Sequence, residues 1–158
     1  MGVLRDYFRG PDSATVTDLM QRHDGDSLAA IDEWTVDVVD AKGLDPAVCL
    51  DALCSFIVGV EWAERRAGGR LIWPVLDGDA LMEHQGPWVE LLDDAVRDAL
   101  AGVDDDRIPE LAARWARIEE IHWPGAPDEA LVPVLTELVA LARATRAADD
   151  HLYCWMSL

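Results

Sequence analysis

The fold is decided at the end of the sequence, where residues 131–148, LVPVLTELVALARATRAA, run into residues 151–158, HLYCWMSL. Apolar residues of the first segment recur every three or four positions, which places one apolar stripe along a helix. The second segment is too short for an ordinary helix, and an apolar chain end persists when it is paired inside a sheet. The pattern therefore predicts a helix followed by a strand near the middle of the sheet.

The rest of the sequence predicts a single α+β domain over residues 1–158. Helices are expected over residues 13–22, 46–65, 93–102, 107–122 and 131–148. Strands are expected over 3–8, 34–39 and 151–158, an edge strand or extended segment over 71–75, and a short apolar segment over 88–92. Residues 76–85 read as an irregular loop that can hold one helical turn. The expected architecture is a small sheet containing the N- and C-terminal strands, packed against about four or five helices.

Composition and charge bound the class of protein. A chain of 158 residues buries roughly two thirds of its unfolded surface, and 51% hydrophobic residues with seven tryptophans are typical of a globular protein. The formal net charge of −18 therefore lies on a folded body. Such a field repels nucleic acid and anionic membrane, so we expect a macromolecular partner to be basic. Lys42 is the single lysine, a usage typical of a GC-rich bacterial genome.

The expected compartment is the cytoplasm. The three cysteines include no C-x-x-C pair, so a disulfide framework is not expected. Residues 1–9 carry charges and lack the apolar region of a secretory signal. The longest apolar run, 47–60, is interrupted by Asp51 and is too short to span a bilayer.

Short motifs along the chain carry a family resemblance. These are Met1-Gly2 with Tyr7 and Phe8, Asp40-Ala41-Lys42 before an apolar helix, Leu76-Asp77-Gly78, Gly86-Pro87, and Glu120-Ile121-His122-Trp123-Pro124-Gly125 before a long helix and a terminal strand. In this layout the chain resembles the YfbM-like family, a group of bacterial proteins classed as a domain of unknown function. The resemblance implies the fold expected above, and it implies no activity, because none is established for the family.

No metal site or cofactor is predicted. Glu119 and His122 form one E-x-x-H element, whereas a di-iron site uses two such elements and two further glutamates. The remaining histidines have no glutamate three residues before them. His122 can instead cap the end of its helix, where a cation is favoured.

No catalytic residue is predicted either. The serines occur in no G-x-S-x-G context, and Gly68-Gly69 lacks the spacing and the lysine of a phosphate-binding loop. Cys154 falls in the predicted buried strand, where a thiol is usually inert. His151 beside Asp149 and Asp150 can be read as an acid/base pair or as a solvated corner, and the solvated corner is the commoner arrangement.

The tryptophans indicate a binding surface. Seven indole rings are hard to bury with every N–H satisfied, so some are expected at the rim of a groove. Trp73, Trp88 and Trp123 each neighbour a proline, in loops that could converge. With Glu119 and His122 they form the predicted binding site, and the alternative is that these tryptophans only fill the core.

Two classes of function follow. The first is a non-enzymatic acidic binding protein for a basic protein partner, immunity-like or inhibitor-like. The second is a small enzyme or ligand-binding domain with a pocket lined by tryptophan and histidine, between residues 73–88 and 121–125. The sequence does not decide the oligomeric state.

Overall fold

A computed structural model of the chain describes residues 3–34, 37–59, 69–121 and 127–158. Its centre is an antiparallel sheet of five strands in the order β2-β1-β5-β4-β3. The strands are β1 (Leu4–Gly10), β2 (Val38–Asp40), β3 (Arg70–Trp73), β4 (Trp88–Leu91) and β5 (His151–Ser157). The last strand, β5, therefore occupies the middle of the sheet, as predicted.

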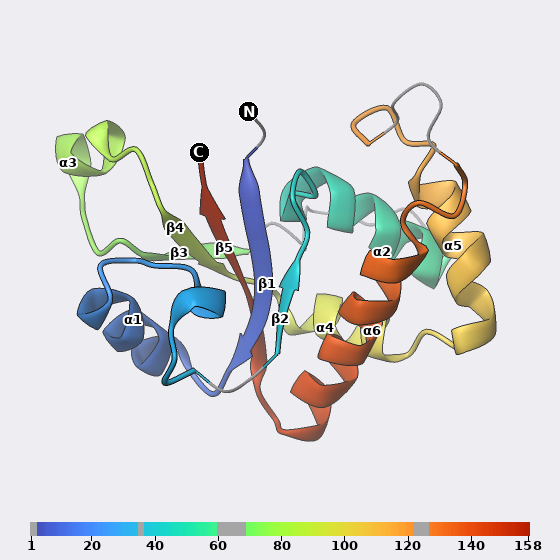
Figure 1. The fold of residues 1–158 in the computed structure, drawn as a ribbon, viewed down its shortest axis with the longest axis horizontal. Helices are drawn as coiled ribbons and strands as arrows, with labels where there is room; N and C mark the ends of the chain where they lie inside the picture. Colours follow the sequence, from blue (N-terminus) through green and yellow to red (C-terminus); the bar gives the residue numbers. More distant parts are fainter. Residues whose placement is uncertain (1–2, 35–36, 60–68, 122–126) are drawn as a thin grey trace.

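The first and last strands pair along their whole length, from Leu4 opposite Ser157 to Gly10 opposite His151. The start of β1 and the end of β5 lie side by side in Figure 1. On its other side β5 pairs with β4, so the closing strand is hydrogen-bonded on both flanks. The prediction that the N- and C-terminal strands share one sheet is confirmed.

Helices cover both faces of the sheet. They are α1 (Ser13–Arg22), α2 (Asp51–Val58), α3 (Gly78–Glu83), α4 (Asp94–Ala101), α5 (Ile108–Trp115) and α6 (Val132–Ala147). A π-helical turn, Pro46–Leu50, precedes α2, and short 3₁₀ turns lie at Leu28–Ala30 and Asp105–Arg107. Figure 1 shows α1 on one side of the sheet and α2, α4, α5 and α6 together on the other.

Successive side chains of β5 point to opposite faces of the sheet and belong to two separate cores. Tyr153 and Trp155 belong to the core on the α1 face, whose other buried members are Phe8, Val16, Leu19, Met20, Leu28, Ile31, Trp73 and Val89. Leu152 and Cys154 belong to the larger core on the α6 face, which includes Tyr7, Leu53, Val96, Leu111, Trp115, Leu135 and Leu138. A strand that is apolar at every position is expected where both faces are covered. The run of apolar residues in 152–155 is thus explained by its central place.

Helix α1 has the predicted bounds, and Asp12 caps it, since the Asp12 carboxylate accepts a hydrogen bond from Thr15 N at 2.7 Å. Two other helices end earlier than predicted. Helix α2 stops at Val58 and not at Arg65, because Gly59 adopts the left-handed conformation at φ 77° that ends helices. Residues 60–68 lie outside the described residues.

Helix α5 ends at Trp115 and not at His122. After it the chain forms turns in which amides bond to the third residue back, such as Ile118 N to Trp115 O and Ile121 N to Ile118 O. The predicted strand over 34–39 is also shorter, since β2 covers only Val38–Asp40. The expected helical turn in 76–85 is the short helix α3.

The three cysteines, Cys49, Cys54 and Cys154, are free and buried in the core on the α6 face. In the described part of the chain no helix is both long and apolar enough to cross a bilayer.

Candidate functional site

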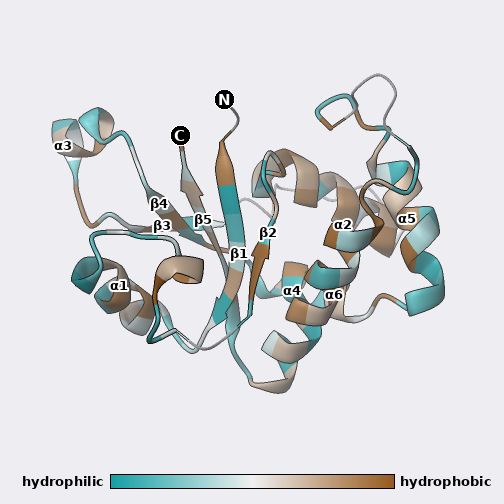
Figure 2. Cartoon of the chain, in the orientation of Figure 1, coloured by the Kyte–Doolittle hydropathy of each residue, from teal (hydrophilic) through white to brown (hydrophobic). Residues whose placement is uncertain are grey.

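The segment between β3 and β4, residues 74–87, projects from the edge of the sheet, and we call it the α3 arm. Figure 1 shows α3 standing away from the other helices, and none of its residues is buried. Val75 is 74% exposed and Met82 is 85% exposed, and Leu76 is exposed beside them. Figure 2 shows hydrophobic and hydrophilic residues mixed along the arm. Several exposed apolar side chains on one short projecting segment are typical of a contact surface.

Acids accompany these apolar side chains. The arm carries Asp77, Asp79 and Glu83, all exposed, and residues 74–87 contain no lysine or arginine. Its formal charge is therefore negative while its exposed apolar surface is large. This combination favours a partner that is both apolar and basic at its contact surface.

A histidine between two tryptophans forms the base of the arm. The ring of His84 meets Trp73 at 6.1 Å and Trp88 at 5.6 Å between centroids, each edge to face. His84 Nε2 donates a hydrogen bond to Pro87 O at 2.8 Å. Edge-to-face aromatic contacts and this bond hold the two ends of the arm together.

The base is also fixed to the body of the protein. Gly25 has φ +76°, and a Cβ built on it would lie 2.5 Å from the Trp73 ring and 2.8 Å from Pro87. Only glycine fits so close an approach in this backbone conformation. Trp155 Nε1 of the central strand donates to Gly25 O at 2.8 Å. The loop around Gly25 therefore links the arm to β5.

The structure brings two of the five predicted binding residues together. Trp73 is 9% exposed and lies in the core on the α1 face, and the half-buried Trp88 lies across His84 from it. Glu119 is exposed in the turns after α5, a helix of the opposite face. His122 and Trp123 lie outside the described residues. His84 was not among the predicted residues, although its place between two proline-flanked tryptophans is visible in the sequence.

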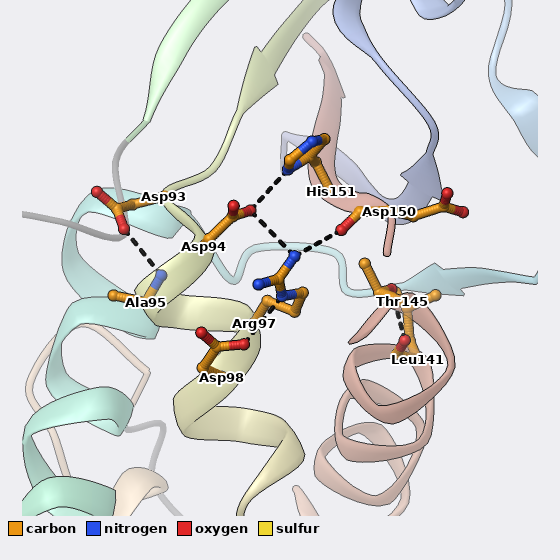
Figure 3. Close-up of polar contacts among 9 residues, drawn as sticks. All are labelled: Asp93, Asp94, Ala95, Arg97, Asp98, Leu141, Thr145, Asp150 and His151. Carbon is orange, nitrogen blue, oxygen red and sulfur yellow. Dashed lines mark hydrogen bonds and ion pairs between the residues drawn. The ribbon is translucent and has the colours of Figure 1, made fainter. Parts of the chain in front are cut away.

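A second polar cluster lies where α4, α6 and β5 meet (Figure 3). His151 Nδ1 donates to Asp94 Oδ1 at 2.7 Å, so the partner of His151 is neither Asp149 nor Asp150. Arg97 lies beside this pair and donates to Asp98 at 2.9 Å and to the backbone oxygen of Asp150 at 2.8 Å. The hydrogen bond that Arg97 donates to Asp98 is the main cause that raises the pKa of Arg97.

This cluster joins α4 to the start of β5, and in the described residues it lacks a nucleophile next to the histidine. His151 and Asp94 line a recess of about 320 Å³ with Leu91, Leu92 and Asp93. An acid/base histidine acts on a hydroxyl or thiol within hydrogen-bond reach. Among the described residues His151 bonds to Asp94, and no serine or cysteine bonds to it. Sequence spacing could not reveal this pair, because 57 residues separate its members.

Buried polar groups also line the sheet on the α6 face. Cys154 lies opposite Tyr7 on one neighbouring strand and opposite Glu90 on the other. Burial raises the pKa of Glu90, and the charge of Arg5 partly opposes this rise. Burial also raises the pKa of Cys154, so its thiol stays protonated at neutral pH. Within the described residues no group of three or more histidine, cysteine, aspartate or glutamate side chains could hold a metal ion.

Fold and arm together define a three-layer α+β domain with an acidic, partly apolar projection. No family model and no curated protein matches the chain. Among solved structures it is similar to that of YfbM from Escherichia coli, a protein of unknown function, with 13% sequence identity and a TM-score of 0.46 over 97% of this chain and 99% of that chain. The resemblance expected from the sequence is thus found again among solved structures, and it assigns no activity.

Proposed function

We propose that this chain is a non-enzymatic binding protein that docks a basic protein partner on its α3 arm. One observation carries the proposal. Eight large hydrophobic residues are exposed in the described part of the chain, and four of them belong to one stretch of 12 residues in β3 and the arm: Leu71, Val75, Leu76 and Met82. Exposed apolar side chains scattered singly are ordinary, whereas a gathered set marks an interaction site.

Charge selects the kind of partner. The net charge of −18 and the three acids of the arm repel an acidic protein and attract a basic one. Complementary charge speeds the encounter, and the apolar side chains then supply the buried contact. An immunity-like or inhibitor-like protein, which blocks a basic partner by covering it, is the form of this function that we favour.

The fixed base of the arm suits this function. Because His84 already contacts both Trp73 and Trp88, the base loses little conformational freedom when a partner docks. The Gly25 loop adds a second attachment. A pre-organised projection binds more tightly than a loop that must first be ordered.

The alternative function, an enzyme or ligand-binding domain, requires residues 73–88 and 121–125 to face one pocket. Trp73 lies in the core on the α1 face and Ile121 in the core on the α6 face. Residues 122–126 are outside the described part. The described members of the two segments, Trp73 and Ile121, therefore lie on opposite faces of the sheet, and for this reason we favour the binding protein.

Capture at two salt concentrations tests the proposal. The immobilised protein should retain a basic partner from a lysate of its native cells at about 0.05 M salt and lose most of it at about 0.5 M, because salt screens exposed charges. Met82→Glu should abolish capture, since it places a charge in the apolar contact. Val58→Glu is the matched control, because Val58 is 49% exposed on α2, away from the arm.

Two results would contradict the proposal. One is that no basic protein is retained in a salt-sensitive manner. The other is that Met82→Glu and Val58→Glu retain the same partner equally well, since the arm would then take no part in the contact.

A further inference from the structure

We infer that the partner, on the function proposed above, contributes an extended basic segment that adds to the sheet as a sixth strand along β3. The segment lies in the groove between β3 and α1, next to the α3 arm. Strand addition of this kind obtains affinity from backbone hydrogen bonds and specificity from alternate side chains.

In the described part of the chain, no strand pairs with the outer edge of β3. This strand pairs with β4 on one side and has no neighbour on the other among the described strands. An edge strand presents a row of unpaired backbone N–H and C=O groups to that side. The register of β3 shifts between Leu71 and Trp73, and the strand has only four residues. A short, bulged edge is a weak template for self-pairing, so a partner needs a further contact to bind there.

Helix α1 supplies that contact. A groove of about 590 Å³ runs between the strand and the helix. One wall is lined by Arg70, Leu71 and Ile72 of β3, and the other by Ser13, Ala14, Thr17, Asp18 and Gln21 of α1. A segment paired with β3 would therefore place every second side chain against the helix.

At the opposite edge of the sheet, the described residues line a smaller crevice. There β2 lies against α6, and Val38 and Val39 share a crevice of about 180 Å³ with Glu137, Ala140 and Leu141. Covering an edge with a helix is one way in which proteins prevent strand addition. Of the two edges in the described sheet, the β3 edge has the larger adjoining groove.

Charge favours a basic segment over a second copy of the chain. Within the groove, Arg70 on the strand wall offsets Asp18 on the helix wall, and Asp18 is itself ion-paired with Arg22 at 2.9 Å. The negative charge near the groove therefore comes from Asp77 and Asp79 of the arm and from the net charge of −18. A second copy would bring one charge of −18 against another. Lysine or arginine at the positions facing α1 meets Asp18, Thr17 and Gln21, and apolar residues at alternate positions lie beside the exposed Leu71.

A synthetic peptide tests this geometry on the full chain. The probe is a fluorescein-labelled peptide of about ten residues in which lysine and valine alternate, long enough to pair with all of β3. It should bind at about 0.05 M salt, and hydrogen exchange of the amides in residues 70–73 should slow when it is bound. A peptide with proline in place of the two central valines, which cannot pair as a strand, should not bind.

Two groove variants and one control locate the binding. Thr17→Arg and Gln21→Arg each place a cation on the groove wall and should weaken peptide binding by about tenfold or more. Thr15→Arg adds the same charge on the same helix outside the groove lining, and should change binding by less than about twofold. If Thr17→Arg does not fold because Thr17 is half-buried, Gln21→Arg still tests the groove, since Gln21 is exposed.

Four outcomes would overturn the inference that a basic segment adds to β3. These outcomes are a peptide that does not bind, binding without slower exchange in residues 70–73, equal weakening by all three variants, and a dimer of the chain that Gln21→Arg dissociates. Salt-sensitive capture of a basic partner that depends on Met82 but not on Gln21 would leave the proposed function standing and the strand addition refuted.

Discussion

Replacing Trp115 by phenylalanine tests whether the core on the α6 face depends on a single indole hydrogen bond. Trp115 is fully buried, and its Nε1 donates to the backbone oxygen of Cys49 at 2.8 Å, joining α5 to the turn before α2. Leaving that oxygen without its donor costs about 1–3 kcal/mol. The smaller ring loses about 40 Å² of burial, or about 1 kcal/mol at about 25 cal/mol per Å².

The expected loss for Trp115→Phe is therefore about 2–4 kcal/mol, which lowers the Tm of a chain this long by about 4–16 °C. Trp34→Phe is the matched control. Its Nε1 is buried and has no hydrogen-bond partner in the described part of the chain. Removing an unsatisfied donor offsets the lost packing, so this variant should be neutral or more stable by up to about 2 kcal/mol.

Urea unfolding followed by circular dichroism measures both changes. The two variants make the same chemical replacement, so their difference isolates the state of the indole N–H. If Trp115→Phe loses less than about 1 kcal/mol relative to Trp34→Phe, the hydrogen bond to Cys49 is not what holds α5 in place.

Three further predictions concern titration, close packing and thiol reactivity. Burial raises the pKa of Glu90 above its ordinary 4.5, so the folded state binds that proton more tightly than the unfolded state. In urea unfolding at pH 7, Glu90→Gln should therefore have a larger free energy of unfolding than the wild type. This difference in free energy should shrink as the pH falls through the raised pKa toward 4.5. A wild type that is more stable than the variant at every pH would contradict the prediction. Gly25→Ala should lower the Tm more than Gly43→Ala, because both residues have positive φ but only at Gly25 would the new Cβ collide, 2.5 Å from Trp73. Thiol reagents should label the folded protein very slowly at pH 8, and they should label all three cysteines in urea. Burial raises the pKa of Cys49 to about 11 and that of Cys54 to about 12, so few thiolates are present in the folded protein. Fast labelling of the folded protein would refute the burial of these thiols.

The architecture could be predicted from the sequence because its strongest signals are local. The three-and-four spacing of Leu135, Leu138 and Val139 predicts α6, and the apolar run after it predicts a buried strand. Pro74 correctly places β3 at an edge. Helix ends were less predictable, since the left-handed conformation of Gly59 and the turns after Trp115 are set by neighbours that an apolar pattern does not reveal.

The candidate site was only partly predictable, because it depends on contacts between distant residues. The proline neighbours predict that Trp73 and Trp88 lie in loops that could converge, whereas the structure places Trp73 at the end of β3 and Trp88 at the start of β4. Both rings contact His84, which was not predicted. The support from Gly25 and the pairing of His151 with Asp94 join residues far apart in sequence. Nothing in local spacing encodes such contacts, whereas the acidity of the arm can be read directly from residues 74–87.

The central place of β5 has a consequence for how the protein is made. Strands β1 and β2 form one pair, β3 and β4 form another, and within the described sheet β5 alone joins them. During synthesis from the amino end, both pairs emerge before the strand that connects them. Pairing between sequence-distant strands is also slow. We expect the nascent chain to leave the ribosome with two uncovered apolar surfaces and to depend on chaperones until residue 157 is free.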